Sequence, residues 1–138
     1  REAFTAYGEY VNELGELAAA SDIISLHVPL TNETSGLIDT TFLQAMQPHS
    51  FLINTARGPV VDEAALISAL TNGEIAGAAL DVFATEPLPA EHPLRHTPNT
   101  ILLPHISFNT RTALAERFQV TVDNLVAYHN GAPAHVVS

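Results

Sequence analysis

The chain has 138 residues, of which 46% are hydrophobic, and a formal net charge of −10. This length suits one domain with its own core, and the acidic balance argues against nucleic acid, whose phosphates need clustered cations. There is no cysteine, which excludes disulfides and thiolate metal sites. No stretch reaches transmembrane length and no secretory leader opens the chain, so we expect no membrane contact and a cytoplasmic location.

The first third of the chain alternates between helical and strand patterns. In chain order, the sequence predicts a helix over residues 1–8, a short strand over 9–11, a helix capped by Asn12 and running to residue 20, a strand over 23–28 and, after a polar turn at 31–35, a helix over 40–46. The run at 23–28 is almost continuously apolar, which is typical of a strand buried on both faces.

The alternation continues through the rest of the chain. The sequence predicts a strand over 51–54, a helix that is capped by Asp62 and ends at Asn72 and Gly73, a strand over 75–82, a proline-rich loop over 85–98 with a short turn at 91–95, a strand over 100–103, a helix over 110–128 and an extended tail. Strands that alternate with helices indicate a parallel sheet with right-handed crossovers. The predicted fold is therefore a doubly wound α/β unit.

Three polar residues follow predicted strands at the edge where such sheets bind ligands. Arg57 follows the strand at 51–54, Glu86 comes soon after the strand at 75–82, and His105 follows the strand at 100–103. Arginine offers a planar fork of donors to a carboxylate, and histidine exchanges protons near neutral pH. Together they suggest an acid–base site with an anion clamp.

Four segments carry a family resemblance: HVPLTNETSGLID at 27–39, NTARG at 54–58, ALDVFATEP at 79–87 and LLPHIS at 102–107. They resemble the signature segments of the D-isomer-specific 2-hydroxyacid dehydrogenases, in the family's order and spacing. The resemblance implies hydride transfer between NAD(P) and a small 2-hydroxy or 2-oxo acid of the D-lactate, glycerate/hydroxypyruvate or phosphoglycerate type. Glu86 favours these enzymes over the related formate dehydrogenases, which carry glutamine there.

The resemblance also implies roles for individual residues. His105 would exchange the substrate's proton, Glu86 would fix its tautomer and stabilise the imidazolium, and Arg57 would bind the substrate carboxylate. The cofactor would be held by Val28, Pro29, Thr34, Thr55, Ala56, Arg57, Asp81, His105 and Ser107.

The chain has no G-x-G-x-x-G turn for a pyrophosphate. In the resembled family that turn and most of the substrate domain lie upstream, so we expect a partial, Rossmann-like cofactor domain that lacks its N-terminal half. Residues 1–130 would be the C-terminal part of the NAD-binding domain, and 131–138 a tail returning toward the substrate domain. The cofactor would be NAD, with NADP left open, and the family predicts a homodimer.

Two other functional classes stay open at this point. The same motifs occur in NAD(H)-sensing corepressors, which act as scaffolds for partner proteins, and the chain by itself could be a catalytically inert fragment. A metal site is not expected, since His92 and His96 flank a proline in a loop and lack a third ligand at helical spacing. A Ser–His–Asp hydrolase is excluded by the lack of a G-x-S-x-G elbow.

Overall fold

The computed structural model describes residues 7–136, and the chain divides into two units, residues 1–105 and 106–138. Most of the helix predicted over residues 1–8 and the last two residues of the predicted tail lie outside the described residues. No helix within residues 7–136 has the length and apolar composition needed to cross a membrane.

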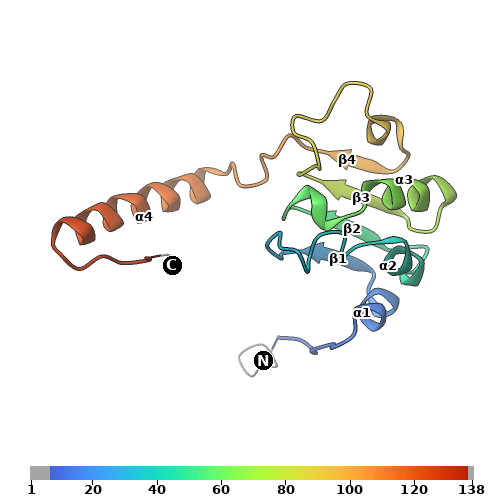
Figure 1. Ribbon diagram of the computed structural model, residues 1–138, viewed down its shortest axis with the longest axis horizontal. Coiled ribbons are helices and arrows are strands. Elements are labelled where there is room, and N and C mark those ends of the chain that lie inside the picture. Colours follow the sequence, from blue (N-terminus) through green and yellow to red (C-terminus); the bar gives the residue numbers. More distant parts are fainter. Residues whose placement is uncertain (1–6, 137–138) are drawn as a thin grey trace. The chain divides into compact units, whose positions relative to one another are not determined.

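The first unit is built on a parallel sheet of four strands, β1 (Ile23–Leu26), β2 (Phe51–Asn54), β3 (Gly77–Leu80) and β4 (Thr100–Leu102), in the order β1-β2-β3-β4 (Figure 1). The register pairs Leu26 with Asn54, Asn54 with Leu80 and Leu80 with Leu102. All four strands therefore end at one edge of the sheet. This confirms the predicted parallel, Rossmann-like sheet.

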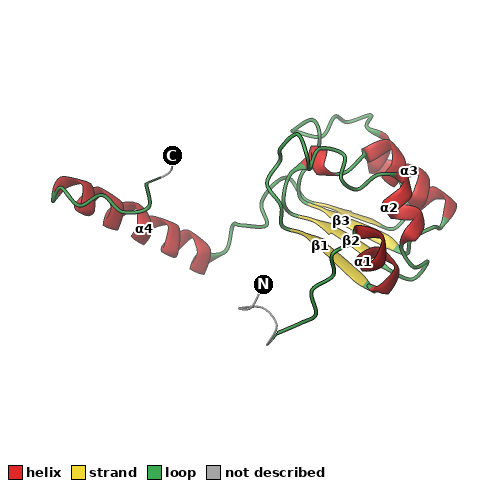
Figure 2. Cartoon of the chain, turned by 60° about the horizontal axis from the view of Figure 1, so that its bottom comes forward, coloured by secondary structure: helices red, strands yellow, loops and turns green. Residues whose placement is uncertain are grey.

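Three helices cover one face of this sheet: α1 (Leu14–Ala20), α2 (Thr40–Ala45) and α3 (Glu63–Asn72) (Figure 2). Each connection moves to the next strand in the same direction, so right-handed crossovers bring α2 and α3 to the same side. Large apolar side chains from both layers fill the space between them, among them Leu43, Leu52 and Leu66, which are at most 1% exposed. The described strands and helices thus form the part of the predicted doubly wound fold in which the helices cover one face of the sheet.

Local caps fix the ends of α3 as the sequence predicts. The Asp62 carboxylate accepts hydrogen bonds from the N–H groups of Ala64 and Ala65, at 3.0 and 3.1 Å. At the other end Gly73 has a φ of 69°, a left-handed conformation that glycine adopts without steric cost. These caps set the position of the first turn of α3, which lies near the site described below.

Two predictions at the start of the chain are wrong. Residues 9–11 form no strand, and the described sheet begins with β1. The residue that caps α1 is Glu13 rather than Asn12, and its side chain makes no capping hydrogen bond.

The apolar run at 23–28 also differs from its prediction. The paired strand ends at Leu26, and its burial alternates, with Ile24 buried and Ile23 62% exposed. The reason is that α1, α2 and α3 lie on one face, so only alternate side chains of β1 enter the core. The strand predicted over 75–82 is likewise shorter, since it pairs with the four residues of β2.

The second unit contains one long helix, α4 (Arg111–His129), which confirms the pattern predicted over 110–128. The Thr110 hydroxyl accepts the N–H of Ala113 at 3.1 Å as its N-cap. The guanidinium of Arg117 lies 5.2 Å from the ring centroid of Phe108, a cation–π distance.

Candidate active site

The arginine turn after β2 is shaped by a buried side-chain amide. Asn54, 1% exposed, donates from Nδ2 to the carbonyl of Arg57 at 3.0 Å and accepts from the N–H of Ala56 at 3.0 Å. These two bonds close the turn as the chain leaves the sheet. They leave the Arg57 side chain exposed at the carboxyl edge, with Nη1 donating to the carbonyl of Ala56 at 2.6 Å.

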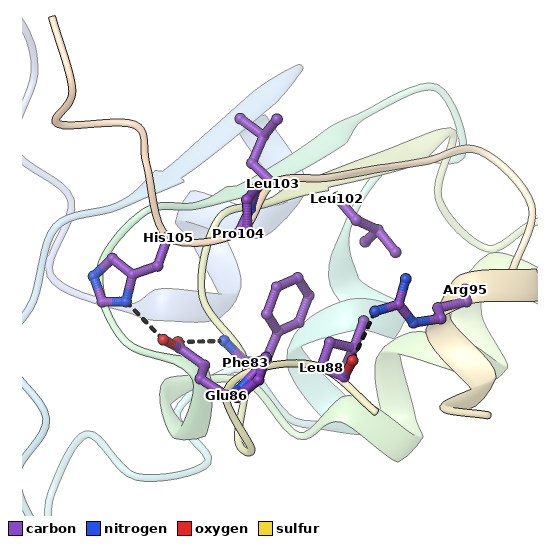
Figure 3. A pocket seen from close by; sticks show the side chains of 9 residues that line it. Phe83, Glu86, Leu88, Arg95, Leu102, Leu103, Pro104 and His105 are labelled. Carbon is purple, nitrogen blue, oxygen red and sulfur yellow. Dashed lines mark hydrogen bonds and ion pairs between the residues drawn. The ribbon is translucent and has the colours of Figure 1, made fainter. Parts of the chain in front are cut away.

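A second turn follows β3 and carries Glu86. Its Oε1 accepts the backbone N–H of Phe83 at 3.0 Å, and its Oε2 lies 2.7 Å from Nδ1 of His105 (Figure 3). Glu86 and His105 are 19 residues apart in sequence, so the contact depends on the parallel register of β3 and β4. The structure therefore brings together two of the three residues predicted to do chemistry.

The hydrogen bonds to Glu86 favour its ionised form. The N–H of Phe83, and after it the His105 ring, hold the pKa of Glu86 below its ordinary value of 4.5, while partial burial opposes this effect. Glu86 is therefore a carboxylate at neutral pH. A carboxylate at this position accepts a hydrogen bond from the N–H group at Nδ1 of His105 and so directs Nε2 away from Glu86.

The backbone of His105 has an uncommon conformation. Its φ is 56°, in the left-handed region, which costs an L-residue on the order of 1–2 kcal/mol. Such strained residues cluster at functional sites, where the surrounding structure holds them. The strain and the contact with Glu86 are independent features that single out the same side chain.

The Glu86–His105 pair opens on a cavity of about 530 Å³ in the first unit. Figure 3 shows the pair at one end and Arg95 at the other, with apolar side chains between them. Its walls are formed by Phe83, Glu86, Pro87, Leu88, Arg95, Leu102, Leu103, Pro104 and His105. Arg95 braces the loop beneath, because its Nη2 and Nε donate to the carbonyls of Leu88 and Pro89 at 2.7 and 2.8 Å.

A second cavity, of about 420 Å³, lies at the ends of β1 and β2. It is lined by His27, Val28, Pro29, Leu30, Thr55, Ala56 and Arg57. Five of these residues, Val28, Pro29, Thr55, Ala56 and Arg57, were predicted to contact a cofactor. The size and the mixed polar and apolar lining match a small-molecule site, so the residues present fit part of a nucleotide cofactor.

The two cavities have no lining residue in common, and Arg57 is therefore not in the cavity of Glu86 and His105. The turns that carry them are nevertheless neighbours. A Cβ atom at Gly58 would lie only 2.0 Å from the carbonyl carbon of Phe83. The glycine after Arg57 thus lets the arginine turn and the turn of Glu86 touch.

Three predicted cofactor residues lie outside both cavities. Thr34 ties its own turn together, since its hydroxyl donates to the carbonyl of Pro29 at 2.6 Å and accepts the N–H of Thr31 at 2.8 Å. Asp81 is 2% exposed at the end of β3. Ser107 belongs to the second unit.

Sequence reasoning missed the residues that support the site. Asn54 and Gly58 belong to the NTARG segment, and a buried amide at a strand end could have been suspected from its place after an apolar run. Arg95 and Leu88 gave no such signal, because they sit in a proline-rich loop. Within residues 7–136 no group of three histidine, aspartate or glutamate side chains is arranged to hold a metal ion, and His92 faces Glu63 instead.

A family comparison agrees with this geometry. The family described as D-isomer specific 2-hydroxyacid dehydrogenase, NAD binding domain, matches residues 1–107. The chain is 50% identical over 119 residues to a glyoxylate reductase of Thermofilum pendens, covering 86% of this chain and 35% of that protein. It is 48% identical over 119 residues to glyoxylate/hydroxypyruvate reductase B of Serratia proteamaculans, covering 86% and 37%.

A solved structure supports the same grouping. The D-isomer specific 2-hydroxyacid dehydrogenase of Lactobacillus delbrueckii ssp. bulgaricus, in its NAD-complexed form, is 30% identical with a TM-score of 0.87, covering 100% of this chain and 46% of that one. The chain thus spans between about a third and a half of the length of these relatives. With the family match over residues 1–107, the chain belongs to the D-isomer specific 2-hydroxyacid dehydrogenase family.

Proposed function

We propose that this protein is an NAD(P)-dependent dehydrogenase that interconverts a small 2-hydroxy acid and the corresponding 2-oxo acid. The observation that carries the proposal is the 2.7 Å contact between Nδ1 of His105 and Oε2 of Glu86, at the carboxyl edge of a parallel sheet. When bound, the nicotinamide supplies or accepts the hydride at C2 of the acid. The residues of this chain handle the proton, the carboxylate and the position of the reactants.

His105 moves the proton. Because Nδ1 is held by Glu86, Nε2 is the nitrogen that donates a proton to the carbonyl oxygen in reduction, and takes it from the hydroxyl in oxidation. Glu86 is ionised and stabilises the imidazolium, and its own position is fixed by the N–H of Phe83. The third partner in this arrangement is the substrate, whose oxygen gains or loses the proton carried by Nε2 of His105.

Arg57 binds the substrate carboxylate. Its guanidinium is always charged and keeps donors for a planar anion beyond the one that bonds to Ala56. The contact of Gly58 with the Phe83–Ala84 peptide holds this arginine turn next to the turn of Glu86. Positive charge near the reacting oxygen also stabilises the alkoxide character that develops there.

In this proposal the second cavity would hold part of the cofactor. Val28 and Pro29, which line it, would form a wall of the adenine site, and Thr55 and Ala56, which also line it, would present backbone groups toward the nicotinamide. Thr34, Asp81 and Ser107 keep the cofactor roles that the family resemblance implies, Asp81 toward the carboxamide.

The domain boundaries also remain predictions. In the proposed arrangement residues 1–130 form the C-terminal part of an NAD-binding domain, and 131–138 return toward a substrate domain. A homodimer and a cytoplasmic location stay predictions from the sequence.

The test is oxidation of NADH and of NADPH by the complete enzyme, with glyoxylate, hydroxypyruvate and pyruvate offered one at a time. We expect turnover with at least one of the three acids, and the ratio of kcat/KM values gives the preferred acid and cofactor. Cofactor binding without turnover on any of them contradicts the proposal and favours a cofactor-sensing scaffold.

A further inference from the structure

The first residue of α3 contacts the loop that carries Glu86. Oε1 of Glu63 accepts the backbone N–H of Ala84 at 2.7 Å, across 21 positions of sequence. Its Oε2 lies 3.4 Å from Nε2 of His92, and the two side chains are 17% and 23% exposed. A partly shielded carboxylate with two partners in one loop is more than a solvated surface charge.

The bond from Glu63 falls at an informative place in that loop. The N–H of Phe83 binds Glu86, and the next N–H along the chain, that of Ala84, binds Glu63. Two successive peptide groups are thus oriented by two different carboxylates. Turning the Phe83–Ala84 peptide away from Glu63 would also move the chain that presents Glu86 to His105.

His92 fixes the second oxygen of Glu63. Its Nδ1 accepts the N–H of Leu94 at 3.3 Å, so the proton of the neutral ring is on Nε2, which points at Glu63. Through this contact Glu63 holds the start of the 3₁₀ helix η3 (Pro93–His96) as well as Ala84. The proline-rich loop is therefore attached to α3 at two points.

We propose that Glu63 is a positioning residue for the Glu86–His105 pair, an assignment that rests on the function proposed above. Glu63 bonds to the backbone of Ala84 and does not line the cavity of Glu86 and His105. It acts by holding the Ala84 N–H, and through it the turn that places the Glu86 carboxylate 2.7 Å from His105. The site needs a hydrogen-bond acceptor at the reach of the Glu63 side chain from α3, where it holds the N–H of Ala84, and does not need the negative charge of Glu63.

Two substitutions separate acceptor from charge. Glu63→Gln keeps an Oε1 atom within reach of Ala84 but removes the charge, and it gives up the contact with His92, because its NH₂ group would face the Nε2–H of that ring. Glu63→Asp keeps the charge at the N-terminus of α3, where it favours the helix, but shortens the side chain by one methylene and loses Ala84. Glu91→Ala, at an exposed residue of the same loop, is the matched control.

The first readout is the pKa of Glu86, followed by the NMR shift of its side-chain carboxyl carbon in the complete enzyme. The groups that set this pKa are the Phe83 N–H and His105, which lower it, and Asp81, which raises it. In Glu63→Asp we expect the pKa of Glu86 to rise, because the Phe83 N–H moves. In Glu63→Gln and Glu91→Ala we expect no rise.

The second readout is turnover. For Glu63→Asp we expect kcat to fall on the order of tenfold with KM changed by less than about twofold, since misplaced catalytic groups lower the rate without weakening binding. Glu63→Gln and Glu91→Ala are expected to stay within about twofold of the unmodified enzyme.

Each result decides the inference. If Glu63 acts through its charge, Glu63→Gln is impaired and Glu63→Asp is normal. If its role is purely structural, both variants lose stability with no change in the pKa of Glu86. Either result overturns the assignment. The carboxyl titration does not depend on turnover, so the inference is decided even where the unmodified enzyme reduces none of the acids and the proposed function itself fails.

Discussion

Replacing Gly58 by alanine would place a methyl group where the Phe83–Ala84 peptide lies. The added Cβ would be 2.0 Å from the carbonyl carbon of Phe83, 2.1 Å from its oxygen and 2.5 Å from the nitrogen of Ala84. Non-bonded carbon atoms pack best at about 3.5–4.0 Å, so the peptide would have to retreat by roughly 1.5 Å. The backbone of Gly58 is not left-handed, which means that steric overlap, rather than φ, carries the cost.

The expected loss is large because the obstacle is backbone. Overpacking a well-packed site costs about 1–3 kcal/mol when side chains can adjust. Here Phe83 is 6% exposed and its peptide is held by Glu86 and Glu63, so moving it also strains two hydrogen bonds to carboxylates. We therefore expect a decrease in the free energy of unfolding of about 3 kcal/mol, at the upper end of that range.

The assay is urea denaturation followed by circular dichroism, with Gly15→Ala as the matched control. Apart from its chain neighbours and the backbone of α1 itself, nothing lies within 4 Å of a Cβ at Gly15, so alanine there is expected to cost nothing and to gain up to about 1 kcal/mol. A free energy of unfolding for Gly58→Ala within about 0.5 kcal/mol of that of the unmodified protein would contradict this prediction, because the two turns would then not be in fixed contact.

Three further predictions concern single side chains. Asp62→Ala removes both capping bonds of α3 and should lower the free energy of unfolding by about 1 kcal/mol in the same denaturation assay; an unchanged value would show that the cap is dispensable. Glu86 has a lowered folded-state pKa, so the stability that it adds to the fold is present above its ordinary pKa of 4.5 and is lost as pH falls through the folded-state pKa. Glu86→Gln should therefore lose less stability than the unmodified protein on going from neutral pH to below 4.5. Parallel curves of unfolding free energy against pH for the two proteins would contradict this. Arg57→Gln should raise KM for the 2-oxo acid, on the order of tenfold or more, whereas an unchanged KM would remove Arg57 from the carboxylate site.

The elements that sequence predicted well are those whose signals are local. The helix after Asp62 was predicted at both ends because an N-cap carboxylate and a glycine in a left-handed conformation act within one turn of chain. The strand over 51–54 was predicted residue for residue, since it is short, apolar and followed by turn residues.

Predictions that depend on partners were less accurate. Residues 9–11 have the composition of a strand but are not part of the described sheet, and only four residues of each of the runs at 23–28 and 75–82 pair with β2. One-sided burial of β1 could not be predicted from its apolar run. It depends on where the helices lie, which is a property of the tertiary fold.

The residues of the site divide in the same way, into those with a local sequence signal and those that depend on a distant partner. Glu86 and His105 were predicted from motifs at strand ends, and the parallel register brings them to 2.7 Å. The role of Gly58 as a contact point and the bond from Glu63 to Ala84 join segments more than 20 residues apart. Neither has a sequence signature of its own, because the partner in each case is a backbone peptide.

The proton-transfer role of His105 is tested most directly by His105→Asn in the complete enzyme, measured as kcat for 2-oxo acid reduction together with cofactor affinity. Asparagine keeps a donor near the Glu86 carboxylate and tolerates the left-handed backbone at this position, but it cannot deliver a proton as imidazolium does. We expect a loss in kcat of about 10²–10⁴-fold with cofactor affinity within about twofold. A kcat within about threefold of the unmodified enzyme would contradict it, since the proton would then come from a group other than His105.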